Sequence, residues 1–431
     1  PHRLAPSTGQ TNLHQTAEPL EFPNSSSSSS PSGNTSSPKK IHLENLFENH
    51  RSPDITTKKK DPVIVVLQLS GGNDYLNTVV PHADPHYFDY RPIVNVSEDQ
   101  VLHLDDQVGF HPSMKPIQKM YQDGNVAILH GVGYENSPRS HFRSMDIWHT
   151  CEPDTLGTEG WLARIVRDLD PDKDNVVTAV SMGPSLFRAL VGPGVPVATV
   201  ENIDSYGMLT GLPPEEKLSR VLSRYRRVYS PAIGTGPVMD YLGQTGLDAL
   251  EGADILAAAP ANYSSTIEYA DSPVGKKLKG IAQIHLAGLG SRIFYLDHGG
   301  FDTHADQIST HSKLWEEVSR GIQDFFDDLK EHGEADNVVM FLFSEFGRRV
   351  QDNGGGTDHG AGGVCLVIGD NVKGGQYGEY PSTREADLEQ GDLVPSTDFR
   401  SVYTTLVEDW MGLDPTEVVG GTFEKPEFIS K

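Results

Sequence analysis

Short apolar runs that alternate with helix-like segments are the feature that most constrains this chain. An apolar run suits a strand that is covered on both faces, as in a parallel sheet between helices. Residues 314–329 carry apolar side chains on one helical face, as a covering helix does. We therefore predict an α/β fold with a mostly parallel central sheet between helical layers. The runs are VIVVLQL (63–69), VAIL (126–129), IFYL (293–296), VVMFLF (338–343) and VCLVIG (364–369).

The first 60 residues differ in composition from the rest of the chain. They include SSSSSSPSGNTSSPKK and few apolar residues. Such a segment buries too little apolar surface to offset the entropy lost on ordering. We predict a low-complexity, largely disordered tail over residues 1–60 and a single α/β domain over residues 61–431.

Charge and cysteine content narrow the classes of partner. The chain has 60 acidic and 35 basic residues, a net charge of -25, which argues against nucleic acid as a general partner. No apolar stretch reaches the roughly 18 residues of a membrane span.

The chain has two cysteines, Cys151 and Cys365, which are free thiols or form one bridge. Cys365 lies in an apolar run, which favours its packing as a small buried hydrophobe. The oligomeric state does not follow from the sequence.

Carboxylates and imidazoles gather where the predicted strands end. Ligands of open α/β sheets bind beyond the carboxyl ends of the strands, so these side chains share one location. Mixed oxygen and nitrogen donors suit a divalent ion, with zinc, manganese and calcium as candidates. The predicted metal ligands are Asp74, Asp302, His304, Glu345 and His359.

Several of these ligands have alternative interpretations. Asp74 could instead begin an Asx turn. Glu345 ends an apolar strand, so it either ligates the metal or pairs with Arg348. Asp302 and His304 are one residue apart and point to the same side of an extended segment. The residues expected to support the ligands from behind are Asn73, Arg143, His298 and Asp358.

Ser140 is the candidate nucleophile, because it precedes the predicted helix HFRSMDIWHT. A helix N-terminus stabilises a bound anion, although serine is also an ordinary N-cap. His141 can supply a proton, and Arg348 or Arg143 can balance developing charge. We predict Ser140, His141 and Arg348 as catalytic residues.

The motifs LQLSGGNDYLNTVVP, HGGFDTHADQ, FSEFGRRVQDNGGGTDHGAGG and DFRSVYTTLVEDWMG resemble a mainly bacterial family of unknown function. That family lies within the alkaline phosphatase and sulfatase superfamily, and the resemblance spans residues 62–415. It implies an alkaline phosphatase-like, three-layer α/β/α sandwich with one or two divalent metals beside a nucleophile. It also implies export, so we expect a periplasmic or extracellular location.

The resemblance assigns roles by position. It places the first metal aspartate at Asp74, the nucleophile at Ser140 and the last histidine ligand at His359. Phe346 stands where better-known relatives carry a histidine ligand, which argues against a complete second metal site.

We therefore predict a metal-dependent hydrolase acting on a phosphate or sulfate ester of a small molecule or glycan. The alternative is a non-catalytic exported surface or carbohydrate-binding protein that keeps the fold with a structural metal or none. A peptidase or esterase using Ser140 with His141 ranks last, because adjacent residues rarely face each other as a catalytic pair must.

Overall fold

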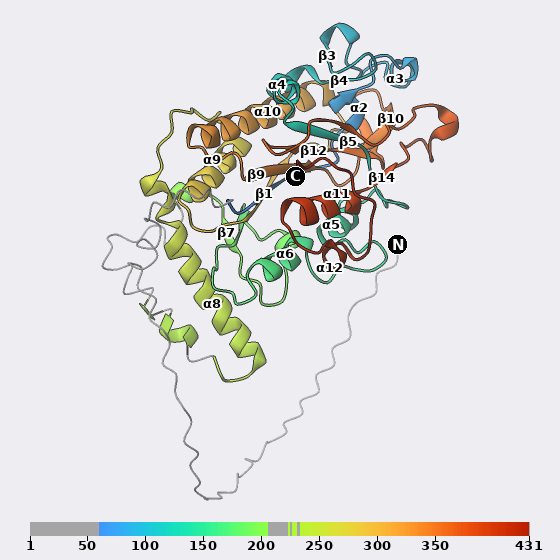
Figure 1. Ribbon diagram of the computed structural model, residues 1–431. Helices are drawn as coiled ribbons and strands as arrows, with labels where there is room; N and C mark the ends of the chain where they lie inside the picture. Colours follow the sequence, from blue (N-terminus) through green and yellow to red (C-terminus); the bar gives the residue numbers. More distant parts are fainter. Residues whose placement is uncertain (1–59, 206–222, 225, 231–232, 431) are drawn as a thin grey trace, which may run out of the picture. The chain divides into compact units, whose positions relative to one another are not determined.

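A nine-stranded sheet forms the centre of the computed structural model (Figure 1). Its order is β13-β5-β12-β9-β1-β8-β6-β7, with β14 also paired to β5. The predicted apolar runs form β1, β5, β8, β9 and β12, which make up the middle of the sheet. The strands are β1 (Val63–Ser70), β5 (Val126–Gly133), β6 (Ala179–Met182), β7 (Ala198–Val200), β8 (Ile293–Gly299), β9 (Val338–Phe343), β12 (Gly363–Ile368), β13 (Gly375–Tyr377) and β14 (Thr397–Asp398).

The sheet is mostly parallel, and β12 is the exception. β1 pairs in parallel with β8 and β9, and β6 pairs in parallel with β7 and β8. β12 runs antiparallel to both of its neighbours, β5 and β9. The start of β12 therefore lies at the same sheet edge as the ends of β1, β5, β8 and β9. Residues that precede β12 reach the edge where residues that follow the other strands lie.

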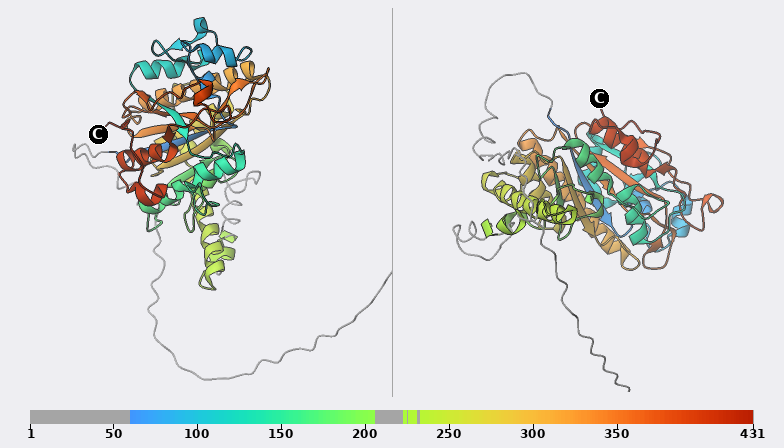
Figure 2. Two further views of the ribbon diagram at one scale, coloured as in Figure 1. Left: turned by 90° about the vertical axis from the view of Figure 1, so that its right-hand side faces the viewer. Right: turned by 90° about the horizontal axis from the view of Figure 1, so that it is seen from below.

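Helices cover both faces of the sheet. Val65 and Leu67 of β1 belong to one hydrophobic core with α4, α9 and α10, whereas Ile64 and Val66 belong to a second core with α5, α6, α11 and α12. Figures 1 and 2 show these two helical layers on opposite sides of the strands. The predicted three-layer α/β/α arrangement is confirmed. The helices are α4 (Lys115–Gln122), α5 (His141–Thr150), α6 (Trp161–Leu169), α9 (Pro273–Leu286), α10 (Gln307–Glu331), α11 (Phe399–Thr405) and α12 (Pro415–Val419).

Smaller elements surround this frame. A two-stranded sheet, β10-β11, follows β9, and a three-stranded sheet has the order β2-β4-β3. The bounds are α2 (Tyr75–Thr78), β2 (Val79–Val80), α3 (Pro85–Tyr90), β3 (Leu102–His103), β4 (Gly109–Phe110), α8 (Pro237–Leu256), β10 (Arg348–Asp352) and β11 (Thr357–His359).

Gly71 lets the end of β1 approach the loop that follows β8. Its φ of 123° is disfavoured for other residues, and a Cβ there would lie 2.3 Å from the backbone nitrogen of Asp302. Any side chain at position 71 would therefore displace the segment that carries Asp302.

The structure describes residues 60–205, 223–224, 226–230 and 233–430. The predicted tail lies outside this range apart from Lys60, and residues 59–431 form one compact unit. No helix in the described part is both long enough and apolar enough to cross a bilayer. Cys151 and Cys365 are free and buried, so Cys365 is packed as a small hydrophobe.

Candidate metal centre

Three histidines surround the carboxylate of Asp302. His141, Asp302 and His359 each offer a ligand atom, and these atoms lie within 4.8 Å of one another. The Nε2 atoms of His141 and His359 are 3.5 and 3.1 Å from Asp302. His304 is not one of these three, but its Nε2 lies 3.0 Å from Asp302 Oδ1 and 3.0 Å from His359 Nε2. We call these four residues the His-Asp cluster.

The second ring nitrogen of each histidine has its own acceptor outside the His-Asp cluster. Nδ1 of His141 lies 2.8 Å from Glu345, and Nδ1 of His304 lies 2.9 Å from Asp358. Nδ1 of His359 lies 3.0 Å from the backbone carbonyl of Arg139.

A carbonyl or carboxylate oxygen accepts a hydrogen bond, so each ring donates to its outer acceptor through Nδ1–H. Nε2 of each ring lies towards Asp302, where it can donate to the carboxylate or, when deprotonated, bind a metal ion. Metal-ligating histidines are held in this way by carboxylates and carbonyls behind them. Three imidazole nitrogens and one carboxylate are a donor set that fits zinc.

The four residues of the His-Asp cluster come from three segments that are distant in sequence. His141 is the first residue of α5, which follows β5. Asp302 and His304 lie in the loop after β8. His359 ends β11 and pairs with Arg348 of β10. They meet because β5 and β8 end, and β12 begins, at one sheet edge.

Arg348 is a positioning residue rather than a free cation. Its buried guanidinium donates to the carbonyls of Gly71, Gly72, Phe301 and Thr357 and to Asp302 Oδ1, the last at 2.7 Å. Partial burial would raise the pKa of Asp302, but the hydrogen bonds from Arg348 and His359 outweigh it and lower that pKa to about 2. The predicted role of Arg348 in balancing developing charge needs correction, because its guanidinium is fully buried and binds four backbone carbonyls and Asp302.

Glu345 acts behind His141. It is buried, and its carboxylate accepts from the backbone N–H of Gly71 at 2.9 Å and from Ser344 Oγ at 3.1 Å. Its hydrogen bond to His141 raises the pKa of that imidazole. The predicted ion pair between Glu345 and Arg348 is not among the contacts of the described residues, and Glu345 faces the back of a ligand rather than the centre.

Phe346 packs against the two histidines that flank the centre. Its ring lies 5.0 Å from the ring of His141 and 4.8 Å from that of His359. A buried phenyl ring therefore stands at the position where the resemblance places a histidine ligand of a second metal. The ring also fixes the orientation of both imidazoles.

Asp74 lies outside the His-Asp cluster, so its predicted role as a metal ligand needs correction. Its carboxylate is fully buried and is bound by both terminal nitrogens of Arg91, at 2.6 and 2.9 Å, and by Gln307. Burial would raise the pKa of Asp74, but the charge of Arg91 outweighs it and the pKa is lowered. The guanidinium occupies both oxygens that a metal ion would need.

Three predicted supporting residues also have partners elsewhere. Asn73 Oδ1 is bonded to Thr78, His311 and Trp315 behind the sheet edge. His298 lies 3.4 Å from Glu317 of α10. Arg143 pairs with Asp146 at 2.6 Å and donates to the carbonyls of Glu152 and Pro153. Of the predicted supporting residues, Asp358 alone touches a cluster histidine.

Ser140 is exposed at the start of α5 and makes no capping hydrogen bond to that helix. The adjacent His141 directs its ring nitrogens to Glu345 and Asp302 instead. The serine–histidine pair of a peptidase or esterase is therefore not formed.

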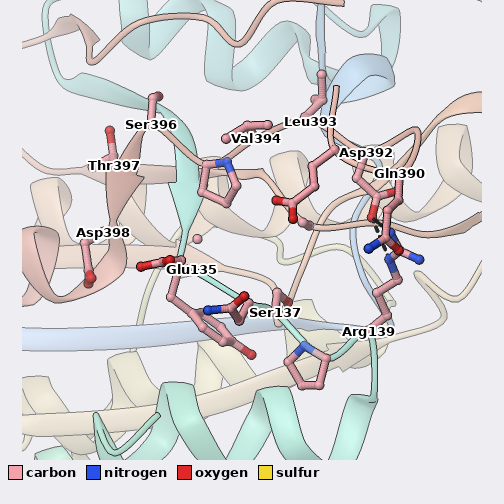
Figure 3. Close-up of a pocket in the computed structure, with 17 residues that line it drawn as sticks. Glu135, Ser137, Arg139, Gln390, Asp392, Leu393, Val394, Ser396, Thr397 and Asp398 are labelled. Carbon is pink, nitrogen blue, oxygen red and sulfur yellow. Dashed lines mark hydrogen bonds and ion pairs between the residues drawn. The ribbon is translucent and has the colours of Figure 1, made fainter. Parts of the chain in front are cut away.

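An open cleft of about 620 Å³ adjoins the His-Asp cluster. Asp302, His141 and Glu345 line it on the cluster side, and Phe142 and Arg188 line it further out. A second pocket of about 640 Å³ is lined by residues 133–139 and 389–398 (Figure 3). Figure 3 shows Arg139 bonded to the buried Asp392. This bond holds Arg139 in place, and the backbone carbonyl of Arg139 binds Nδ1 of His359.

Two functional roles were missed in the sequence. His141 was predicted to supply a proton and was not among the predicted metal ligands, whereas its Nε2 lies 3.5 Å from Asp302 in one group with His359. Its position directly beyond β5 was the available signal. Arg91 was not singled out at all. It stands in YRPIV, 17 residues after Asp74, and nothing in that spacing indicates their contact.

Comparison with known proteins gives a family and a set of distant structures. Residues 248–429 match the model of a family described as "Protein of unknown function (DUF1501)". The predicted resemblance to a family of unknown function is confirmed over this part of the chain. No curated protein matches the chain.

Solved structures superpose at low identity. A protein in the alkaline phosphatase superfamily from Vibrio parahaemolyticus is 10% identical, with a TM-score of 0.39 over 86% of this chain and 71% of that chain. The C-terminal periplasmic domain of EcEptC from Escherichia coli, in complex with Zn, is 9% identical, with a TM-score of 0.36 over 86% and 90%. The PsFucS1 sulfatase from Pseudoalteromonas sp. is 11% identical, with a TM-score of 0.35 over 89% and 71%.

Proposed function

We propose that this chain is a metal-dependent hydrolase of a phosphate or sulfate ester, with the metal held by His141, Asp302, His304 and His359. One observation carries the proposal: three Nε2 atoms face one carboxylate while each Nδ1 is bound from behind. Zinc fits this donor set best, with manganese as the second candidate. Calcium prefers oxygen ligands and fits least well.

Each residue near the centre has a defined task in this proposal. A bound divalent ion would polarise the ester oxygen and lower the pKa of the attacking hydroxyl. Glu345, Asp358 and the Arg139 carbonyl orient the three imidazoles, and Arg348 holds Asp302. Ser140 is the proposed nucleophile, one residue from His141 in the chain. The free N–H groups at the start of α5 would stabilise negative charge on the transferred group.

Metal content and turnover test the proposal together. The purified protein should bind one zinc ion per chain by elemental analysis and should hydrolyse 4-nitrophenyl phosphate or 4-nitrophenyl sulfate. His359→Ala should lose both properties, whereas the exposed His86→Ala should keep them. Ser140→Ala should keep the metal and lose turnover. Retained turnover in Ser140→Ala would assign the attack to water instead. A protein that binds no divalent ion and is inert on both esters would refute the proposal.

The rival function is a non-catalytic surface or carbohydrate-binding protein. The phenyl ring of Phe346 against both histidines favours it, because that ring leaves no space for a second metal ligand. A metal-dependent rise in melting temperature and glycan binding, without turnover, would support it. Export, which the resemblance implies, stays a prediction.

A further inference from the structure

The cleft beside the His-Asp cluster indicates what kind of ester is recognised. We propose that it binds an ester of a ring-bearing alcohol that carries a second anionic group, with the ring on Phe142 and the second anion at Arg188. This inference rests on the proposed function and names the substrate class of the same site.

Phe142 is the apolar surface for the ring. It follows His141 in α5, lines the cleft and is 92% exposed. A single exposed phenylalanine is common on protein surfaces. This one shares a cleft with Asp302, and Met145 lines the same cleft. A ring stacked on Phe142 would remove its apolar face from water while the ester lies towards the His-Asp cluster.

Arg188 is the candidate partner for the second anion. Asp146 lies between two arginines: Oδ2 is 2.6 Å from Arg143, and Oδ1 is 3.2 Å from Arg188. Arg143 is committed to Asp146 and to two carbonyls, whereas the side chain of Arg188 is 38% exposed. The cleft is also lined by the carboxylates of Asp146, Asp302 and Glu345, and Arg188 is the one arginine or lysine among its described lining residues. A second anion in this cleft would therefore pair with Arg188.

The guanidinium of Arg188 still has donor capacity. Its Nε binds Asp146 and its Nη2 binds the carbonyl of Gly157. Within the described residues Nη1 has no protein partner. A guanidinium fixed on one side and open on the other suits a carboxylate, phosphate or sulfate. In a chain of net charge -25, this guanidinium is a local cation to which an anionic group can bind.

Three phosphate esters separate the two contributions. In the zinc-loaded protein, kcat/KM should rise from methyl phosphate to phenyl phosphate and again to 4-carboxyphenyl phosphate, each step by roughly tenfold. Phe142→Ala should reduce the first step to the part that comes from phenol being the better leaving group, and Arg188→Gln should abolish the second. Arg188→Lys should retain part of the second step, because it keeps the charge. Glucose 1-phosphate and glucuronic acid 1-phosphate also differ by one carboxylate, but on a sugar ring. Whether the aryl pair or the sugar pair has the higher kcat/KM shows which kind of ring the cleft prefers. The matched controls are Ile93→Ala, an exposed apolar residue outside the cleft, and Arg167→Gln, an exposed arginine of α6 paired with Glu159.

A binding measurement makes the test independent of turnover. Phenylphosphonate and 4-carboxyphenylphosphonate are not hydrolysed, and calorimetry on the zinc-loaded protein gives their Kd. Phe142→Ala should raise both Kd values, and Arg188→Gln should raise only the second. Binding with this pattern but without turnover would refute the hydrolase while supporting the recognition. Turnover with unchanged preferences in both variants would overturn the recognition and leave the hydrolase intact, as would phosphonate binding that neither variant alters.

Discussion

Two aspartates at the same sheet edge have opposite surroundings. Asp74 follows β1 and Asp302 follows β8, and these two strands are neighbours. Asp74 is fully buried and paired with Arg91 through both oxygens. The side chain of Asp302 is 47% exposed and faces three imidazole nitrogens. The guanidinium of Arg91 binds both oxygens of Asp74, whereas Arg348 binds only Oδ1 of Asp302, whose carboxylate is half-exposed and open to an ion from solution.

The comparison shows that a carboxylate at a strand end does not by itself define a metal ligand. The deciding factor is whether a guanidinium takes both carboxylate oxygens and the side chain is buried. Arg91 does this for Asp74 and also donates to the carbonyls of Arg349 and Val350, on the strand that carries Arg348. The buried pair therefore fixes the backbone from which Arg348 holds Asp302.

Removing the buried cation should have the largest effect. Arg91→Met leaves the carboxylate of Asp74 buried without a counterion, which should lower the free energy of unfolding by about 3–5 kcal/mol. Urea denaturation without added metal measures this. Asp74→Asn combined with Arg91→Met should recover part of the loss, because no unpaired charge remains.

The open aspartate supplies the contrast. Asp302→Asn should cost less, about 1–3 kcal/mol, because the side chain is half-exposed and the amide oxygen still accepts from the buried Arg348. Similar losses for Arg91→Met and Asp302→Asn would show that the two regions do not differ as described.

Acid should weaken the buried region next. Burial lowers the pKa of His311, which lies near Asp74, to about 4. When the pH falls below 6.5, the ordinary pKa of histidine, His311 binds a proton in the unfolded chain but not in the folded chain. The free energy of unfolding should therefore fall between pH 6.5 and 4, by up to about 3 kcal/mol for this residue. Urea titrations at pH 7.5, 6 and 5 give the slope. His311→Gln should flatten it, and the exposed His86→Gln should not; an unchanged slope in His311→Gln would contradict the assignment.

The smallest effect is expected for Glu345, which binds His141 on the side away from Asp302. Glu345→Gln weakens the support of His141 and should raise the Kd for zinc about 10–100-fold. Competition with a chromogenic chelator measures the affinity. Glu317→Gln is the matched control, because Glu317 contacts His298 away from the centre. Equal affinities in the parent and Glu345→Gln would exclude this role.

The central strands and the residues of the site were predictable to different degrees. Apolar runs predict β1, β8 and β9 because each of these strands is buried on both faces, so nearly all positions before the strand end are apolar. Asp302, His304 and His359 were predictable as donors because their residue types and neighbouring glycines indicate a polar strand end. The opposite role of Asp74 was not predictable, because the same residue type stands in the same kind of position.

The sequence by itself determined the three-layer fold and the donor types, since hydrophobic periodicity and side-chain chemistry are local properties. The tertiary structure alone decided which donors share a centre. The antiparallel direction of β12 brings His359 to the edge reached by Asp302, and the packing of α3 near β10 brings Arg91 to Asp74. Both depend on contacts between segments far apart in the chain, and residue order does not encode such contacts as a readable pattern.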